Sequence, residues 1–143
     1  MITIKVKVLD KSMPVPAYAH AGDAGLDLYS AIDCELKPFE RKKIQTGIKV
    51  SIPDGYAGFI QPRSGIALKN GIGMVNAPGL IDSAYRGEVC AILINLDPDN
   101  TFKIKKGDKI CQMVILGVEE VRLDVVDELS ETTRGESGFG STG

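Results

Sequence analysis

Hydrophobic and polar residues alternate along several short stretches of this chain. Ile2, Ile4, Val6 and Val8 are separated by single polar or charged residues, and residues 44–52 follow a similar pattern. Because successive side chains of a strand point to opposite faces, a period of two is typical of a strand with one buried face. We therefore expect half-buried strands at residues 2–9 and 44–52.

Further strand-like segments follow along the chain. They are residues 56–60, 89–96, 102–104 and 110–116, together with a glycine-rich loop at 21–30 that runs into a strand. Residues 89–96 are nearly all apolar, which is typical of a strand buried on both faces. Only residues 62–69 suit a helix, and Ser64 is its expected N-cap. Many short strands and one short helix indicate an all-β sandwich or barrel.

Residues 76–88 combine turn residues with flanking apolar runs. Pro78-Gly79 and Asp82-Ser83 supply turn chemistry, and the runs on either side suit strands. This pattern predicts a β-hairpin that carries the carboxylate of Asp82 and the ring of Tyr85. A carboxylate, an aromatic face and free peptide groups suit a small planar polar ligand. The plainer interpretation is that both are ordinary turn residues.

Composition and charge exclude several classes of function. The 143 residues fit one domain that is long enough to bury a core. A net charge of -2 gives no electrostatic case for binding nucleic acid or a membrane surface. No apolar run reaches the length of a membrane span, and the first residues resemble a strand rather than a signal peptide.

The cysteines and the one histidine also limit the chemistry. Cys34, Cys90 and Cys111 have no C-x-x-C spacing, and Cys90 and Cys111 lie in apolar runs. We expect these two to be reduced core residues, which favours a reducing cytosol. With His20 as the only histidine, a zinc site built from the usual ligands is not expected.

Three polar residues outside the hairpin are candidates for ligand binding. Asp27 lies where the glycine-rich loop meets a strand, Arg63 precedes the helix, and Gln112 is the one polar residue in an apolar run. An arginine beside free amides at a helix start can bind an anion. The structural alternatives are an Asp27 bonded to local amides, a surface Arg63 and a Gln112 satisfied internally.

The end of the chain differs in composition from the rest. From about residue 124 it is acidic and weakly apolar, and residues 134–143 contain four glycines with Arg134 and Phe139. A terminus of this kind is disordered by default. It could instead close over a nucleotide, with Phe139 on the base and Arg134 on phosphates. We divide the chain into a β domain at 1–126 and a flexible arm at 127–143.

Five short motifs, in order along the chain, resemble those of trimeric deoxyuridine triphosphatases (dUTP diphosphatases). They are Ala-Gly-Leu-Asp-Leu-Tyr-Ser (24–30), Pro-Arg-Ser-Gly-Ile-Ala (62–67), Gly-Leu-Ile-Asp-Ser-Ala-Tyr-Arg-Gly-Glu (79–88), Gly-Asp-Lys-Ile-Cys-Gln-Met (107–113) and the glycine-rich tail (134–143). One motif alone would be weak, but five in register leave little room for coincidence. The tail departs from the usual Gly-Gly before Phe139, because it has Ser137-Gly138.

The resemblance implies a distorted jelly-roll β fold assembled as a homotrimer, in which each active site uses residues of all three subunits. It implies Mg²⁺-dependent hydrolysis of dUTP to dUMP and pyrophosphate in the cytoplasm. This activity limits the incorporation of uracil into DNA and supplies dUMP for dTTP synthesis. Neither nucleic acid nor membrane is an expected partner.

The resemblance also implies roles for individual residues. Asp82 matches the carboxylate that activates the attacking water, and Tyr85 matches the ring that packs on deoxyribose. The uracil reader corresponds to Asn76, Gly79, Leu80 and Ile81. The phosphate-binding residues correspond to Arg63, Ser64, Gly65 and Gln112. Asp27 and Gln112 match groups that hold Mg²⁺ through water. The closing tail corresponds to Arg134, Phe139, Gly140, Ser141 and Thr142.

Two alternatives share the implied fold. A deoxycytidine triphosphate deaminase, or its bifunctional relative, would need a catalytic glutamate near the hairpin, where Glu88 is present. A protein that binds nucleotides without catalysis is the other alternative, against which Asp82, Gln112 and the complete tail argue.

Overall fold

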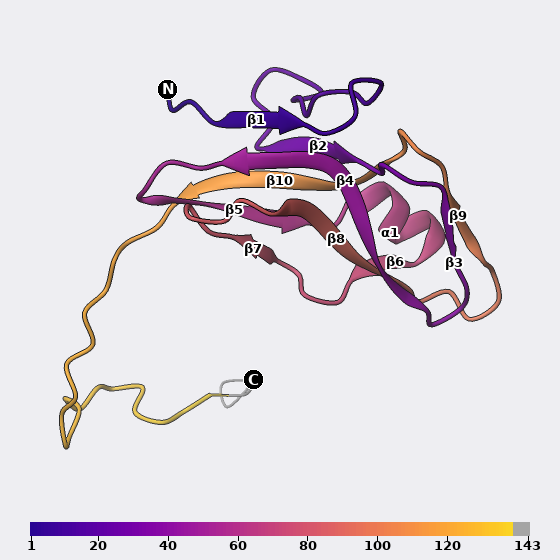
Figure 1. The fold of residues 1–143 in the computed structure, drawn as a ribbon. Coiled ribbons are helices and arrows are strands. Elements are labelled where there is room, and N and C mark those ends of the chain that lie inside the picture. Colours follow the sequence, from indigo (N-terminus) through magenta and orange to yellow (C-terminus); the bar gives the residue numbers. More distant parts are fainter. Residues whose placement is uncertain (139–143) are drawn as a thin grey trace.

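The computed structural model describes residues 1–138, which form two four-stranded sheets and a two-stranded ribbon (Figure 1). The first sheet has the strand order β1 (Lys5–Val8), β4 (Arg41–Ser51), β8 (Glu88–Asn95), β6 (Ile72–Met74). The second has the order β2 (Gly25–Tyr29), β10 (Lys109–Gly117), β5 (Tyr56–Gln61), β7 (Gly79–Ile81). The ribbon pairs β3 (Cys34–Leu36) with β9 (Phe102–Ile104). Neither four-stranded sheet closes on itself, so the predicted all-β fold is a sandwich rather than a barrel.

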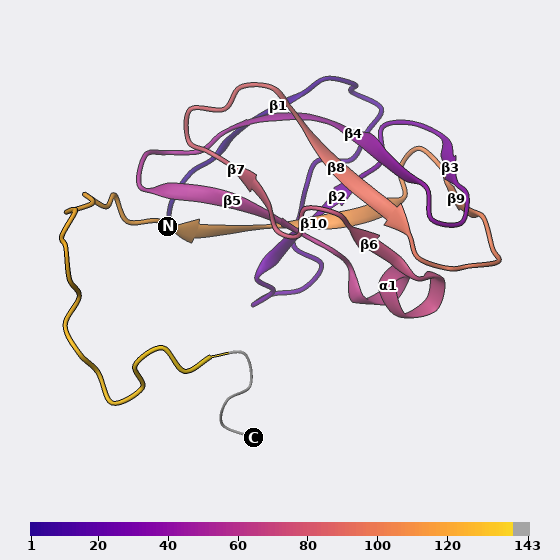
Figure 2. The same cartoon turned by 90° about the horizontal axis from the view of Figure 1, so that it is seen from below.

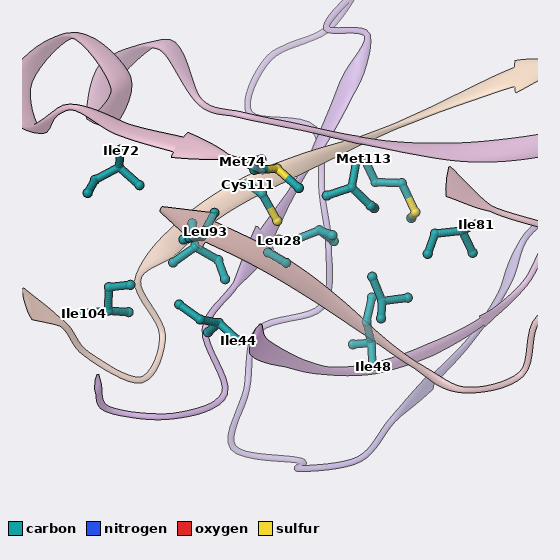
Figure 3. Packing of buried hydrophobic residues seen from close by; sticks show 14 of the residues in the cluster. Leu28, Ile44, Ile48, Ile72, Met74, Ile81, Leu93, Ile104, Cys111 and Met113 are labelled. Atoms are coloured by element: carbon teal, nitrogen blue, oxygen red, sulfur yellow. The ribbon is translucent and has the colours of Figure 1, made fainter. Parts of the chain in front are cut away.

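The core lies between the two larger sheets. Figure 3 shows Ile44, Ile48 and Leu93 of the first sheet packed with Leu28 and Met113 of the second. All five side chains are almost completely buried. Strands that present alternate side chains to a shared interior give such a core.

Strand β8 is buried on one face only, so the prediction that residues 89–96 are buried on both faces is wrong. Val89, Ala91 and Leu93 are buried, whereas Cys90 and Ile92 are half-exposed. The reason is that β8 turns one face to the second sheet, and no part of residues 1–138 fully covers the other. The predicted core position of Cys90 is therefore also wrong. Cys111 is buried as predicted, and burial raises the pKa of its thiol to about 12.

The apolar runs that flank residues 76–88 pair as the predicted hairpin requires, because β6 is antiparallel to β8 with Met74 opposite Leu93. The connection between them, however, contains a further strand and is not a simple turn. Strand β6 pairs with β8 in the first sheet, while β7 pairs with β5 in the second. Residues 75–78 carry the chain from one sheet to the other, and residues 82–87 return it to β8. The segment is therefore a corner that joins the two layers. Alternating apolar residues predict a strand but do not name its partner.

The N-terminal strand is shorter and more exposed than its alternating pattern predicts. It spans Lys5–Val8 and pairs only with β4, at the edge of the sheet. Ile4 and Val8 are half-buried, whereas Ile2 and Val6 are 40% and 39% exposed. An edge strand has a neighbour on one side only, so its side chains are covered less completely.

The predicted short helix is α1 (Ser64–Asn70), but Ser64 is not its cap. Arg63 is the N-cap, with extended backbone angles, and no side chain caps the first turn. Ser64 already belongs to the helix, so its hydroxyl is in the wrong place to serve as the cap acceptor. Gly71 ends the helix with a left-handed φ of 65°, and a Cβ there would lie 3.0 Å from the backbone nitrogen of Asp97. This position therefore requires glycine.

After β10 the chain leaves the β sandwich, as Figures 1 and 2 show. Residues 118–138 contain no helix or strand. Val121, Leu123, Val125 and Leu129 in this segment are 74% to 96% exposed. None of the helices in residues 1–138 is long and apolar enough to cross a membrane. The boundary at residue 126 stays a prediction.

Candidate active site

Five of the predicted site residues line one cavity of about 560 Å³, which we call the cradle. They are Asp27, Arg63, Ser64, Gly65 and Gln112. Asp27 comes from β2 and Gln112 from β10, and these two residues are register partners in the second sheet. Arg63, Ser64 and Gly65 come from the start of α1. The sheet thus supplies one wall of the cradle and the first turn of the helix supplies another.

Two cations compensate the buried carboxylate of Asp27. Its Oδ1 lies 3.2 Å from Arg63 Nε, and its Oδ2 lies 2.6 Å from Lys109 Nζ. Asp27 is only 8% exposed, so pairing offsets the cost of burying its charge. The hydrogen bond to Asp27, together with its negative charge, raises the pKa of Lys109. Asp27 is therefore held by side-chain cations rather than by local backbone amides.

Gln112 has both a structural contact and a place in the cradle. Its Nε2 donates to the carbonyl of Pro62 at 2.9 Å. A Cβ on Gly25 would lie 2.4 Å from Gln112 Oε1, so the amide packs against the bare backbone of Gly25. Glycine at position 25 thus leaves room for the Gln112 side chain, and Pro62 fixes its direction.

Four of the predicted site residues in the segment 76–88 line a second cavity of about 410 Å³, the Asp82 pocket. It contains Leu80, Ile81, Asp82 and Tyr85, with Glu88 and Cys90 at the start of β8. Asp82 is exposed, and its backbone carbonyl accepts from the amide of Tyr85 at 3.1 Å. This bond makes residues 82–85 a turn that presents a carboxylate and an aromatic ring in the same cavity.

The ring of Tyr85 is fixed by its neighbours in the turn. Its hydroxyl donates to the carbonyl of Glu88 at 3.0 Å. A Cβ on Gly87 would lie 2.2 Å from that hydroxyl oxygen, so the ring lies directly on Gly87. Arg86 Nη1 donates to the carbonyls of Ser83 at 2.5 Å and of Tyr85 at 2.7 Å. Together these contacts set the position of the ring.

Glu88 fastens this turn to the sheet. Its Oε1 accepts from the backbone amide of Gly47 at 2.9 Å, at the irregularity in the pairing of β4 with β8. Thr46 Oγ1 donates to the buried carbonyl of Val89 at 2.6 Å. A carboxylate bonded in this way has a structural task.

The remaining predicted residues lie elsewhere. A Cβ on Gly79 would lie 3.4 Å from Asn76 Nδ2, so these two residues are in contact at the corner between the sheets. Arg134 Nε donates to the carbonyl of Ser137 at 3.0 Å in the segment that leaves the sandwich. Phe39 is the only non-glycine residue with positive φ in residues 1–138, so Ser137 adopts its conformation without that strain. Phe139, Gly140, Ser141 and Thr142 lie outside the described residues.

The cradle and the Asp82 pocket share no lining residue. One chain therefore brings the predicted site residues together in two groups and does not join them. Sequence reasoning assigned no role to Lys109, Gly25 or Gly87. Lys109 lies within the fourth motif, three residues before Gln112. A cation so close to a predicted phosphate-binding residue was the one sequence feature that could have marked it as a site residue. The two glycines carry no signal until the side chains that pack on them are known.

Comparison with known proteins places the chain in one family. The model of the dUTPase family matches residues 11–143. A deoxyuridine 5'-triphosphate nucleotidohydrolase of Thermobifida fusca (strain YX) is 50% identical over 142 residues, which cover 99% of this chain and 79% of that protein. The protein of the same name from Clostridium kluyveri is 53% identical over 138 residues, which cover 96% of each chain.

Solved structures agree with this match. The dUTPase of Staphylococcus bacteriophage 80alpha with dUPNHPP superposes with a TM-score of 0.93 at 32% identity, covering 100% of this chain and 99% of that one. A mutant dUTPase of phage phi11 of S. aureus, whose structure shows the coordination of a structural Mg(II) ion, superposes with a TM-score of 0.82 at 29% identity, covering 89% of this chain and 98% of that one. With half of its residues identical to relatives over nearly its whole length, and with the first four motifs on a β sandwich that superposes on dUTPase structures, this chain belongs to the dUTPase family.

Proposed function

We propose that this chain hydrolyses dUTP to dUMP and pyrophosphate, which limits the incorporation of uracil into DNA and supplies dUMP for dTTP synthesis. The observation that carries the proposal is the 50% identity to the Thermobifida nucleotidohydrolase over 99% of the chain. The site described above supplies the groups that such a reaction needs: a cavity for phosphates that contains Arg63 and the start of α1, an exposed carboxylate and an aromatic face.

Asp82 is the base in this proposal. An exposed carboxylate on a hydrogen-bonded turn can hold a water molecule and take its proton as the water oxygen bonds to the α-phosphorus. The bond from the α-phosphorus to the bridging oxygen then breaks, and its electron pair leaves with pyrophosphate. The chain contributes the orientation of the water and the acceptor for its proton.

The cradle binds the phosphates. Arg63 brings a guanidinium, and the first amides of α1, including those of Ser64 and Gly65, have no acceptor within the helix. The hydroxyl of Ser64 stabilises charge on the departing oxygen. Gln112 adds a side-chain amide to the phosphate-binding groups, and the hydrogen bond from its Nε2 to the carbonyl of Pro62 fixes that amide in place. The hydroxyls of Ser141 and Thr142, with Arg134 and Gly140, complete the contacts to phosphate from the tail, and Phe139 covers the base.

Uracil is read by the corner that contains Asn76, Gly79, Leu80 and Ile81. Uracil presents an acceptor, a donor and an acceptor on its pairing edge, and cytosine does not. Fixed peptide groups therefore reject cytosine, because they would be left buried without partners. The contact between Asn76 and Gly79 supports this assignment.

Tyr85 excludes ribose by packing on deoxyribose, and Gly87 sets the position of its ring. We expect Gly87→Ala to displace the ring and to lower the preference for dUTP over UTP by about tenfold. The measurement is kcat/KM for both nucleotides. Gly73→Ala is the matched control, because a Cβ there meets only ordinary contacts at 3.7 Å. An unchanged preference in Gly87→Ala would contradict the assigned role.

Magnesium is the proposed cofactor. No group of three or more His, Cys, Asp and Glu residues within residues 1–138 could hold a metal ion. Mg²⁺ keeps several of its waters and is commonly bound through substrate phosphates, so in this proposal Asp27 and Gln112 would contact the waters of an ion held mainly by the phosphates. The bound ion would neutralise charge on the phosphates. A dUTPase of phage phi11 contains a structural Mg(II) ion.

A homotrimer with shared sites explains why one chain leaves the site in two parts. The cradle and the Asp82 pocket are separate on one chain, and the half-exposed apolar face of β8 is available for another copy. The exposed apolar residues after β10 suit a segment that packs on a neighbouring subunit. In this assembly the cradle comes from one subunit, the Asp82 turn from a second and the tail from a third.

We place the enzyme in the cytoplasm. Its three cysteines are free thiols, which suits a reducing compartment. Its net charge of -2 supports neither nucleic acid nor a membrane as a partner.

The test is the release of pyrophosphate from dUTP, dCTP, dTTP and UTP, with Mg²⁺ or with EDTA, while ammonia is also measured. We expect turnover of dUTP alone and only with Mg²⁺. Ammonia from dCTP would instead indicate a deaminase, although the bond from Gly47 to Glu88 argues against a catalytic glutamate there. Binding of dUTP without turnover would indicate a nucleotide-binding protein without catalysis.

A further inference from the structure

Lys109 completes a set of ionic contacts in the cradle to which the proposed reaction gives no role. It is the first residue of β10, and its Nζ lies 2.6 Å from Asp27 Oδ2. Arg63 Nε lies 3.2 Å from the other oxygen of the same carboxylate. Each oxygen of Asp27 thus has a cation of its own.

Arg63 is held at two points, one of them the backbone carbonyl of Lys109 and the other the carboxylate with which Lys109 also pairs. Arg63 Nη1 donates to the backbone carbonyl of Lys109 at 3.1 Å, while Arg63 Nε pairs with Asp27. A guanidinium is planar and carries five N–H donors in a rigid fork. Fixing Nε and Nη1 therefore sets the direction of the remaining donors, which belong to a side chain that lines the cradle.

The ammonium of Lys109 prevents a competing arrangement. A carboxylate and a guanidinium favour a bidentate pair in which two donors meet two oxygens. Asp27 is 8% exposed, so an oxygen that lost Lys109 would need another donor. Arg63 is the nearest cation, and by rotating onto both oxygens it would withdraw donors from the cavity.

We propose that Lys109 is a positioning residue for phosphate binding: by occupying Asp27 Oδ2 it keeps Arg63 directed into the cradle. This inference rests on the proposed function, because it assumes that Arg63 binds the phosphates of dUTP. Lys109 acts through Asp27 and does not itself contact the substrate.

The first test replaces the ammonium by an apolar side chain of similar length. Lys109→Met should raise KM for dUTP about tenfold and change kcat much less. The reason is that Arg63 would turn toward Asp27, so a charge-assisted contact between Arg63 and the phosphates would be lost from binding. Lys109→Arg can still pair with Asp27 and should restore KM to within about threefold of the wild-type value. The matched control is Lys103→Met on β9, an exposed lysine outside the cradle, which should behave as wild type.

The second test asks whether the effect passes through Asp27. The affinity for the analogue dUpNHpp is measured by calorimetry in the wild type, Lys109→Met, Asp27→Asn and the double variant. If Lys109 acts through Asp27, Lys109→Met should weaken binding about tenfold in the wild type but less than about twofold in the Asp27→Asn background. An equal loss in both backgrounds would mean that Lys109 contacts phosphate directly, which overturns the proposal.

Two other results would also overturn it. One is a Lys109→Met variant that binds as Lys103→Met does. The other is a Lys109→Met variant that has a lower Tm and fewer binding sites per chain but binds dUpNHpp with the affinity of the wild type. That result would mean that Lys109 contributes to stability alone. If the wild type neither binds dUpNHpp nor hydrolyses dUTP, the proposed function itself fails, and that result is distinct from either of these.

Discussion

Asp82→Asn is expected to bind dUTP with near-normal affinity and to hydrolyse it about 10³-fold more slowly or worse. The amide has nearly the shape of the carboxylate but cannot accept the proton of the attacking water, so both the base and much of the water's orientation are lost. Single-turnover rates and the affinity for dUpNHpp measure the two effects separately.

The matched control is Asp54→Asn, which makes the same chemical change in the exposed turn between β4 and β5. Its turnover should equal that of the wild type. Near-normal hydrolysis by Asp82→Asn would contradict the role of Asp82 as the base.

Deletion of residues 134–143 is expected to leave assembly intact and to lower kcat/KM for dUTP by about a hundredfold or more. The deletion removes the groups proposed to close over the base and phosphates, and closure of this kind completes a site and excludes water. It leaves the sandwich unchanged, since the last strand ends at Gly117. Steady-state kinetics and light scattering measure activity and mass.

Ser137→Gly is the comparison for this deletion, because it gives the tail the usual Gly-Gly of the family. Its activity should equal or exceed that of the wild type. A truncated protein with full activity would show that the tail is not part of the site.

Much of the fold was predictable because local patterns determine it. The alternation in residues 44–52 corresponds to part of β4, and the short helix begins within the predicted residues. The jelly-roll fold expected from the five motifs is confirmed by the superposition on dUTPase structures over the whole chain. Period-two alternation and turn residues act over a few neighbours, and so a single sequence reveals them.

What could not be predicted depends on contacts between distant residues. Residues 79–81 lie in the predicted connection of the hairpin, yet they form a strand that pairs with β5. The exposure of Cys90 depends on which face of β8 the second sheet covers. The pairing of Lys109 with Asp27 joins residues that are 82 positions apart, which no periodicity indicates. Sequence motifs named most of the candidate site residues, but their division into two cavities required the structure.

The central claim is that dUTP is hydrolysed in sites shared between subunits, and mixed trimers test it most directly. Chains carrying Asp82→Asn and chains lacking residues 134–143 are co-expressed with different affinity tags, and trimers that carry both tags are isolated. If the Asp82 turn and the tail of a site come from different subunits, every mixed trimer has one intact site, and about one third of the wild-type rate is expected. Mixed trimers as inactive as either parent would show that both elements of each site come from the same chain, which contradicts the account.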